Sequence, residues 1–265
     1  MRYTCRSVIA ARIGDSPMTT RQYWWQAIRW PVALALVAGL ILAVTNGDLA
    51  IANALFFDSA HMRWRGGDSW WTNRFLHTCG GWFVRIVIAA TGVLLVTSFR
   101  RDSLRHWRRP VGYFLLSTLL TVGIVGLLKQ FTNIDCPWDL TPFGGRFPYI
   151  HLFADRPDEL RAAHCFPAAH ASSGYAMMAL YFVAIERRRK WARAGLAVGI
   201  AIGLIFGLAQ QSRGAHFVSH DLCSATIAWC VSLTVYCTAF RGRLWTVVKD
   251  GHVASAPAAA QQLST

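Results

Sequence analysis

Three groups of reactive side chains are separated by long apolar stretches of this sequence. Each group borders such a stretch, and the groups are Lys129, then Pro167-Ala168-Ala169-His170, and then Arg213, His216, His220 and Asp221. Lysine and arginine supply fixed positive charge, histidine titrates near neutral pH, and a helix N-terminus favours an anion, so the combination is typical of a phosphate site. At such a site an imidazole can attack phosphorus, water can hydrolyse the resulting phosphohistidine, and a second histidine can protonate the departing oxygen.

The same residues also have simpler interpretations. A basic side chain at the end of a membrane span often extends its charge to the lipid headgroups, which applies to Lys129 and Arg213. His170 can cap its helix without taking part in chemistry. His216 and His220 are four residues apart, a spacing that permits a zinc site or a structural polar network. At this point the alternatives stay open.

The composition indicates what kind of scaffold positions these groups. Hydrophobic residues make up 54% of the 265 residues, charged residues only 15%, and the mean hydropathy is +0.32. A soluble chain this apolar would expose large hydrophobic patches, and the same composition excludes disorder and collagen-like sequence. Basic residues outnumber acidic ones, 27 to 13, but nucleic-acid-binding proteins gather such charge on a soluble polar face. We therefore expect an all-α integral membrane protein.

Six segments are long and apolar enough, or nearly so, to cross a bilayer, for which a helix needs about 20 residues. They are 30–46, 81–98, 111–128, 171–185, 194–209 and 222–240. Glycines at positions 195, 199 and 203 predict close helix–helix approach in the fifth span. The expected architecture is a six-helix bundle (30–240) with short helices or loops on its outer face, a basic cytoplasmic segment (1–29) and a cytoplasmic tail (241–265) whose last part is disordered.

Loop charges predict the orientation of these spans. With a cytoplasmic N-terminus, 18 basic and 4 acidic residues fall on the inside, against 9 and 9 on the outside, as the positive-inside rule requires. Both termini are then cytoplasmic, and the three reactive groups lie at the outer face, which is periplasmic for a bacterial inner membrane. We expect no signal peptide, because Arg12, Asp15 and Arg21 interrupt any apolar region near the N-terminus.

The order and spacing of the three groups resemble the type 2 phosphatidic acid phosphatases, membrane lipid phosphate phosphatases with a six-helix core. That family shows Lys-x6-Arg-Pro, then Pro-Ser-Gly-His, then Ser-Arg-x5-His-x3-Asp. The corresponding stretches here are Lys129-QFTNID-Cys136-Pro137, Pro167-Ala168-Ala169-His170, and Gly214-Ala215-His216-Phe217-Val218-Ser219, which is similar to the Gly-x-His-Phe-x-Ser core around the family's nucleophile. The resemblance covers about 111–240, half of the chain.

The resemblance implies roles where residues match. His216 would be the nucleophile, His170 would protonate the leaving group, and Lys129 would bind phosphate. Two arginines of the family are replaced, by Cys136 in the first motif and by Gln210 in the third. The resemblance also implies a residue that orients the nucleophile, for which this chain has two candidates.

These candidates are His220 and Asp221. The family's aspartate corresponds in position to His220, and Asp221 follows one residue later. Either can hold the Nδ1–H of His216, and a carboxylate stabilises an imidazolium better, which favours Asp221.

Two other arginines can replace the missing phosphate ligands. Arg213 is close to the nucleophile in sequence, and Arg146 follows two glycines that permit a tight loop. An alternative alignment anchored on Ser212-Arg213 puts Ser219 at the nucleophile position, and it needs a one-residue insertion to reach His220. Both alignments keep the third motif in the same short segment.

The sequence has seven cysteines, and two of them flank the long outer loop. Cys136 and Cys165 would face an oxidising compartment in a bacterial periplasm. A disulfide between them would join the first reactive group to the second, although sequence alone does not establish the pairing.

The predicted function is a cofactor-free, metal-independent hydrolase that removes phosphate from a lipid phosphate or diphosphate at the outer leaflet through a phosphohistidine. One alternative is a phosphotransferase that moves a phosphoryl group from a prenyl diphosphate to another lipid such as lipid A. An alternative of a different class is a small membrane transporter or structural protein. The expected partners are the lipid substrate and membrane lipids, without nucleic acid, and the oligomeric state stays open.

Overall fold

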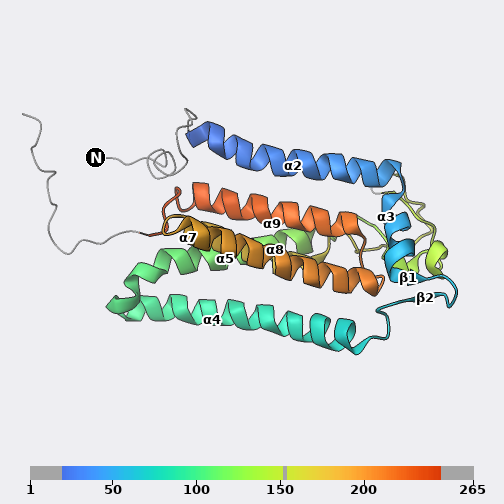
Figure 1. Ribbon diagram of the computed structural model, residues 1–265, viewed down its shortest axis with the longest axis horizontal. Coiled ribbons are helices and arrows are strands. Elements are labelled where there is room, and N and C mark those ends of the chain that lie inside the picture. Colours follow the sequence, from blue (N-terminus) through green and yellow to red (C-terminus); the bar gives the residue numbers. More distant parts are fainter. Residues whose placement is uncertain (1–19, 152–153, 246–265) are drawn as a thin grey trace, which may run out of the picture.

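The computed structural model describes residues 20–151 and 154–245, which form an almost entirely helical bundle (Figure 1). Its elements are α2 (Thr20–Val44), α3 (Gly47–Ile51), η1 (Ala52–Phe56), β1 (Phe57–Asp58), β2 (Arg63–Trp64), η2 (Trp71–Cys79), α4 (Gly80–Arg100), η3 (Asp102–Trp107), α5 (Arg108–Leu128), η4 (Pro137–Asp139), η5 (Thr141–Phe143), α6 (Ala169–Tyr175), η6 (Ala176–Ala179), α7 (Leu180–Ile185), α8 (Arg189–Ser212) and α9 (Val218–Thr238). Within these residues the strands are limited to the short antiparallel pair β1–β2, so the predicted all-α class is confirmed.

Five stretches of helix are long and apolar enough to cross a membrane. They are Trp25–Val44, Trp71–Arg100, Asp102–Leu128, Arg189–Ser212 and Val218–Thr238. Each overlaps one of the predicted spans, and together they identify a multi-pass membrane protein, as expected from the composition.

The predicted span at 171–185 is built differently. α6, η6 and α7 follow one another without a break, and the 3₁₀ turn of η6 separates the two α-helical parts. α8 packs closely along this run because its glycines have no side chain. A Cβ on Gly199 would lie 2.3 Å from the nitrogen of Met178, and one on Gly203 would lie 2.1 Å from the ring of Tyr175. The predicted close approach at these glycines is therefore confirmed.

α2 and α4 are the outermost helices, on opposite sides of the bundle, with α5, α7, α8 and α9 between them (Figure 1). We compared how much of the most apolar part of each span is buried in the bundle. In the span of α2 no residue of that part is buried and in the span of α4 11% are, whereas the share is 39% in the spans of α5 and α9. The exposed side chains of α2 and α4 are large and apolar, such as Leu36 and Ile86. Surfaces of this kind are suited to contact with lipid.

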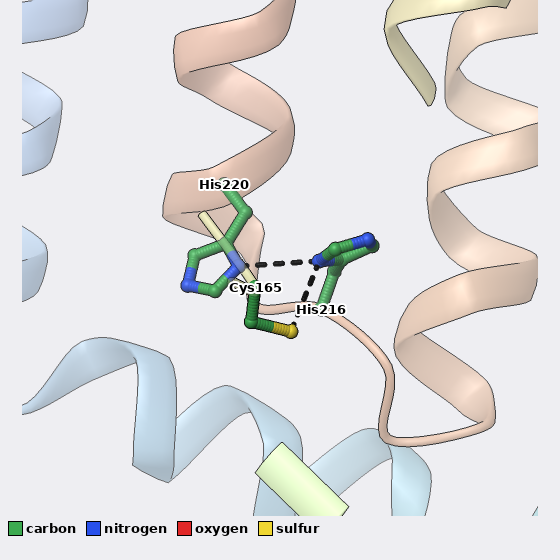
Figure 2. A group of neighbouring side chains, drawn as sticks. All are labelled: Cys165, His216 and His220. Carbon is green, nitrogen blue, oxygen red and sulfur yellow. Dashed lines mark hydrogen bonds between the residues drawn. The ribbon is translucent and has the colours of Figure 1, made fainter. Parts of the chain in front are cut away.

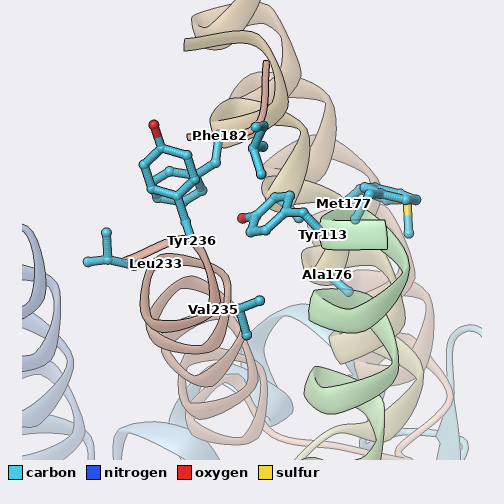
Figure 3. Close-up of a cluster of buried hydrophobic side chains, with 10 residues drawn as sticks. Tyr113, Ala176, Met177, Phe182, Leu233, Val235 and Tyr236 are labelled. Atoms are coloured by element: carbon cyan, nitrogen blue, oxygen red, sulfur yellow. The ribbon is translucent and has the colours of Figure 1, made fainter. Parts of the chain in front are cut away.

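The main hydrophobic core lies between α5, η6, α7 and α9 (Figure 3). Tyr113 of α5, Phe182 of α7 and Tyr236 of α9 are buried there with their rings in edge-on or tilted contact. The hydroxyl of Tyr113 donates to the carbonyl oxygen of Ser232 at 2.9 Å, so this buried polar group has a partner. The core thus joins α5 rigidly to α9.

The two ends of the bundle differ. One end carries β1 and β2, and we call it the hairpin end; the start of α2 and the end of α9 lie together at the opposite end (Figure 1). α2 begins at Thr20, inside the segment 1–29 that was predicted to precede the first span. The rest of that segment, and residues 246–265 of the predicted tail, lie outside the described residues.

Candidate active site

The hairpin end carries an open cavity of about 530 Å³. Lys129, His170 and His216 all line it, although they come from the end of α5, the start of α6 and the turn before α9. One residue from each of the three reactive groups therefore reaches the same space. A cavity of this size is large enough for the polar head of a small ligand.

His216 lies in the turn between α8 and α9 and is only 8% exposed. Its Nδ1 is 3.3 Å from Nδ1 of His220, one helical turn further on, and 3.6 Å from Sγ of Cys165 (Figure 2). Because both contacts use Nδ1, the opposite ring nitrogen, Nε2, is left for a substrate. This is the arrangement that an imidazole nucleophile needs.

The turn that carries His216 depends on a glycine. Gly214 has a φ of +74°, which a residue with a side chain rarely adopts, and its amide donates to the carbonyl of Gln211 at 2.9 Å. The amide of Ala215 donates to the carbonyl of Gln210 at 2.9 Å. A Cβ on Gly214 would lie 2.3 Å from the ring of Trp64, so β2 packs directly on the turn.

The first turn of α9 is capped by a residue from a distant part of the chain. Oδ1 of Asp48 accepts from the backbone nitrogen of Ser219 at 3.0 Å, and Oδ2 accepts from the Ser219 hydroxyl at 2.5 Å. The carboxylate thus satisfies a helical N–H that has no partner within α9. Burial raises the pKa of Asp48, and the hydrogen bonds from Ser219 oppose that rise. Sequence reasoning missed this residue. An acidic residue within an apolar stretch was the feature that could have identified it.

Asp221 does not contact His216. Its Oδ2 accepts a hydrogen bond from Nε2 of Gln211 in α8 and lies against Gly207, while Oδ1 is buried without a hydrogen bond. Of the two residues proposed to orient the nucleophile, His220 is therefore the one beside it. The preference for Asp221 rested on the better stabilisation of an imidazolium by a carboxylate and had no information on the direction of the side chain.

His170 lies at the second residue of α6 and is partly buried. Its Nε2 is 3.2 Å from the carbonyl oxygen of Leu76, and its ring lies 4.6 Å from that of Phe206 and 5.0 Å from that of His77. Since the carbonyl can only accept, Nε2 of His170 carries the proton in that contact, and Nδ1 is the other site for proton exchange.

Lys129 directly follows α5 and is half-buried at the cavity. Burial lowers the pKa of its ammonium group. Across residues 20–151 and 154–245, the ammonium group of Lys129 has no hydrogen-bond or ion-pair partner, so its charge is available to an anion in the cavity.

The arginines proposed as substitutes are placed differently. Arg213 is half-buried and donates to Oε1 of Gln210 at 3.2 Å; Gln210 lines the cavity, whereas Arg213 does not. Arg146 is exposed in the loop after η5 and does not line the cavity either. Arg85 of α4 does line it. Sequence reasoning missed Arg85. A basic residue within an apolar span was the feature that could have identified it.

Cys136 and Cys165 form a disulfide, and both line the cavity. The bond joins the segment after Lys129 to the segment before His170. Cys165 also belongs to a group with His216 and His220 whose donor atoms lie within 4.8 Å of one another. In the disulfide this sulfur is not a thiolate, which leaves two histidines, fewer than the three protein ligands of a typical catalytic zinc site.

Electrostatics favour the neutral form of His216. Burial holds the pKa of His216 well below its ordinary value of 6.5, and the neighbouring basic groups of His220, Lys129 and His170 lower it further. A neutral imidazole is the form that a nucleophilic role requires, and this environment favours that form at neutral pH.

Comparison with known proteins identifies the family of the chain. Neither a curated protein nor a solved structure matches the chain significantly. Residues 110–243, half of the chain, match the PAP2 superfamily and include Lys129, His170 and His216. The chain therefore belongs to the PAP2 superfamily, whose members act on phosphate esters as phosphatases or phosphotransferases.

Proposed function

We propose that this protein is a lipid phosphatase that removes a phosphate group at the outer face of the membrane through a phosphohistidine on His216. The observation that carries the proposal is the meeting of His216, His170 and Lys129 at one cavity in a bundle of membrane-spanning length. A site at the end of such a bundle lets a lipid chain stay in the bilayer while its phosphate meets polar side chains.

In the first step Nε2 of His216 attacks the phosphorus atom and the bond to the leaving oxygen breaks. Lys129 stabilises the negative charge on the phosphoryl oxygens, and His170, in its doubly protonated form, gives the proton on its Nδ1 to the leaving oxygen and keeps the Nε2 proton on the carbonyl of Leu76. The Nδ1–H of His216 donates to Nδ1 of His220, which orients the ring. In the second step His170 takes a proton from water, which attacks the phosphohistidine and releases phosphate.

The distribution of charge supports the outer face as the location of this site. The connections at the far end of the bundle are rich in basic residues, as in Arg187-Arg188-Arg189-Lys190 at the end of the α7–α8 connection and the start of α8, and such segments favour the cytoplasm. In a bacterium, the hairpin end would then face the periplasm, where the disulfide is chemically stable.

The test is phosphate release by the purified full-length protein in detergent. We expect His216→Ala to lower kcat by at least ~10³-fold and His170→Ala by about 10²–10³-fold. His106→Ala is a matched control, because His106 is exposed on η3 and does not line the cavity. Activity retained in the His216 variant would reject the proposed mechanism.

Two further measurements separate the alternatives. Activity should survive EDTA; loss that zinc restores would favour a metal mechanism. Transfer of the phosphoryl group to an added acceptor lipid, in place of release as phosphate, would identify a phosphotransferase that uses the same histidine.

A further inference from the structure

One wall of the cavity is a single face of α4. Gly81, Val84, Arg85 and Ile88 line it, at the three- and four-residue spacing of one helix face, and Val122 of α5 lines it as well. Apart from Arg85, these residues are apolar. The cavity therefore continues from the polar site into a mostly apolar space along α4 and α5.

The depth of Arg85 follows from the direction of α4. A Cβ on Gly80, where the helix begins, would lie 3.5 Å from Nε2 of His170, so the start of α4 is level with that histidine. Arg85 is five residues further along, about 7.5 Å at 1.5 Å per residue, on the membrane side of His170. Ile88 follows about one turn deeper.

Arg85 is a cation without an anionic partner among the residues that the structure describes. Its guanidinium lies 5.1 Å from the ring centre of Trp82, and in the described part of the chain it makes no hydrogen bond or ion pair. A charge within an apolar span is costly and usually marks a functional site. Arg85 is exposed on α4 and also lines the cavity, so its charge is accessible to a ligand there.

We propose that Arg85 binds the chain-linked phosphate of a lipid diphosphate; this inference rests on the proposed function. In such a substrate the terminal phosphate meets His216 and Lys129, the second phosphate lies one bridging oxygen nearer the lipid chain, and the chain begins beyond it. A polar site, then an unpaired arginine, then apolar side chains match that order. A lipid monophosphate would place carbon atoms opposite Arg85.

The inference assigns a role to Arg85 in the chemical step. When His216 attacks the terminal phosphorus, the bond from that phosphorus to the bridging oxygen breaks, and the electron pair stays on the chain-linked phosphate. The leaving group is a lipid monophosphate, and water later releases the terminal phosphate from His216. A guanidinium on the leaving phosphate stabilises its growing charge, and the planar fork of arginine suits two phosphate oxygens.

The test compares a prenyl diphosphate with the prenyl monophosphate of the same chain length, as initial rates with purified full-length protein. We expect the wild type to prefer the diphosphate. Arg85→Gln should lower kcat/KM for the diphosphate by about 10- to 100-fold, the effect of losing a charged hydrogen bond, and leave the monophosphate within about twofold. Arg85→Lys, which keeps the charge, should retain part of the preference.

Arg74→Gln is the matched control, because Arg74 is exposed on η2 and does not line the cavity. It should leave both substrates unchanged. An equal loss on both substrates in Arg85→Gln, or no loss on either, would overturn the inference. Thermal unfolding in detergent shows whether each variant is folded. If Arg85→Gln does not fold, the ratio of kcat/KM for the diphosphate to kcat/KM for the monophosphate is compared between Arg85→Lys and the wild type. An unchanged ratio would then overturn the inference.

Failure of the proposed function has a different signature. If the wild type hydrolyses neither lipid, or if hydrolysis does not depend on His216, then the proposed function and this inference both fall. If both lipids are hydrolysed by a reaction that depends on His216 and the ratio is unchanged in the Arg85 variants, only the diphosphate assignment is rejected.

Discussion

The half of the chain that matches the PAP2 superfamily and the segment before it contribute to the site in different ways. Residues 110–243 supply Lys129, His170 and His216. Residues 47–79 supply none of the motif residues, yet they contact the elements that hold them. These contacts are Asp48 with Ser219, the amide of Gly66 with the carbonyl of Ser212 at 2.9 Å, Trp64 with Gly214, and the carbonyl of Leu76 with His170 at 3.2 Å.

The difference shows that the reactive groups and the contacts that position them come from separate parts of the chain. The α8–α9 turn satisfies only some of its backbone groups itself, and the remaining buried groups need partners from elsewhere. Residues 47–79 supply two of these partners, the amide of Gly66 for the carbonyl of Ser212 and the carboxylate of Asp48 for the amide of Ser219. Substitutions in this segment should therefore alter catalysis although no family motif lies there.

The largest effect in this segment is expected from Trp64→Ala. The ring of Trp64 lies 5.3 Å from that of Phe57 and 4.8 Å from that of Phe143, and it packs on Gly214. Its removal should destabilise the protein by about 2–3 kcal/mol and lower kcat of the folded protein by about tenfold, because the turn that carries His216 loosens.

Trp71→Ala is the control for this variant, because Trp71 is 63% exposed on η2. Thermal unfolding in detergent and kcat, measured well below the transition, separate stability from positioning. An unchanged kcat in folded Trp64→Ala would mean that β2 does not position the turn.

A smaller effect is expected from Asp48→Ala. Loss of a helix cap costs about 1–2 kcal/mol, and kcat should fall several-fold because the start of α9 also carries His220. Asp48→Asn should recover much of the loss, since its amide oxygen still accepts from the Ser219 nitrogen.

Asp68→Ala serves as the comparison, because Asp68 is exposed in the same segment. The readouts are again thermal unfolding and kcat. Equal behaviour of the Asp48 and Asp68 variants would show that the cap contributes nothing to the site.

The smallest effect concerns pH. Because the pKa of His216 lies well below 6.5, we expect the acidic limb of kcat/KM to have its midpoint below pH 6.5. The same difference in pKa affects stability. His216 binds a proton more readily in the unfolded chain than in the folded protein, so the free energy of unfolding falls as the pH drops below 6.5. In Asp48→Ala, looser packing should hydrate His216 and shift the limb towards 6.5. A wild-type midpoint above pH 6.5 would contradict the environment described for His216.

Much of the fold was accessible from sequence because its signals are local. Span length and composition reflect the transfer of side chains into lipid, and the glycines of α8 follow one helix face, so the helices and the approach at Gly199 and Gly203 were predicted correctly. The span formed by α6, η6 and α7 was located, but its 3₁₀ turn carries no glycine or proline that would reveal it.

The sequence by itself determined an all-α membrane protein with three reactive groups bordering its helices. Only the tertiary structure decided which side chains meet. Neighbouring residues on a helix point about 100° apart, so His220 faces His216 while Asp221 faces α8. The packing of α4 beside α5 likewise brings Arg85 to the cavity, whereas the loop after η5 holds Arg146 outside it. Local patterns record the periodicity of one helix, whereas the direction of a side chain towards a distant partner depends on how helices pack together.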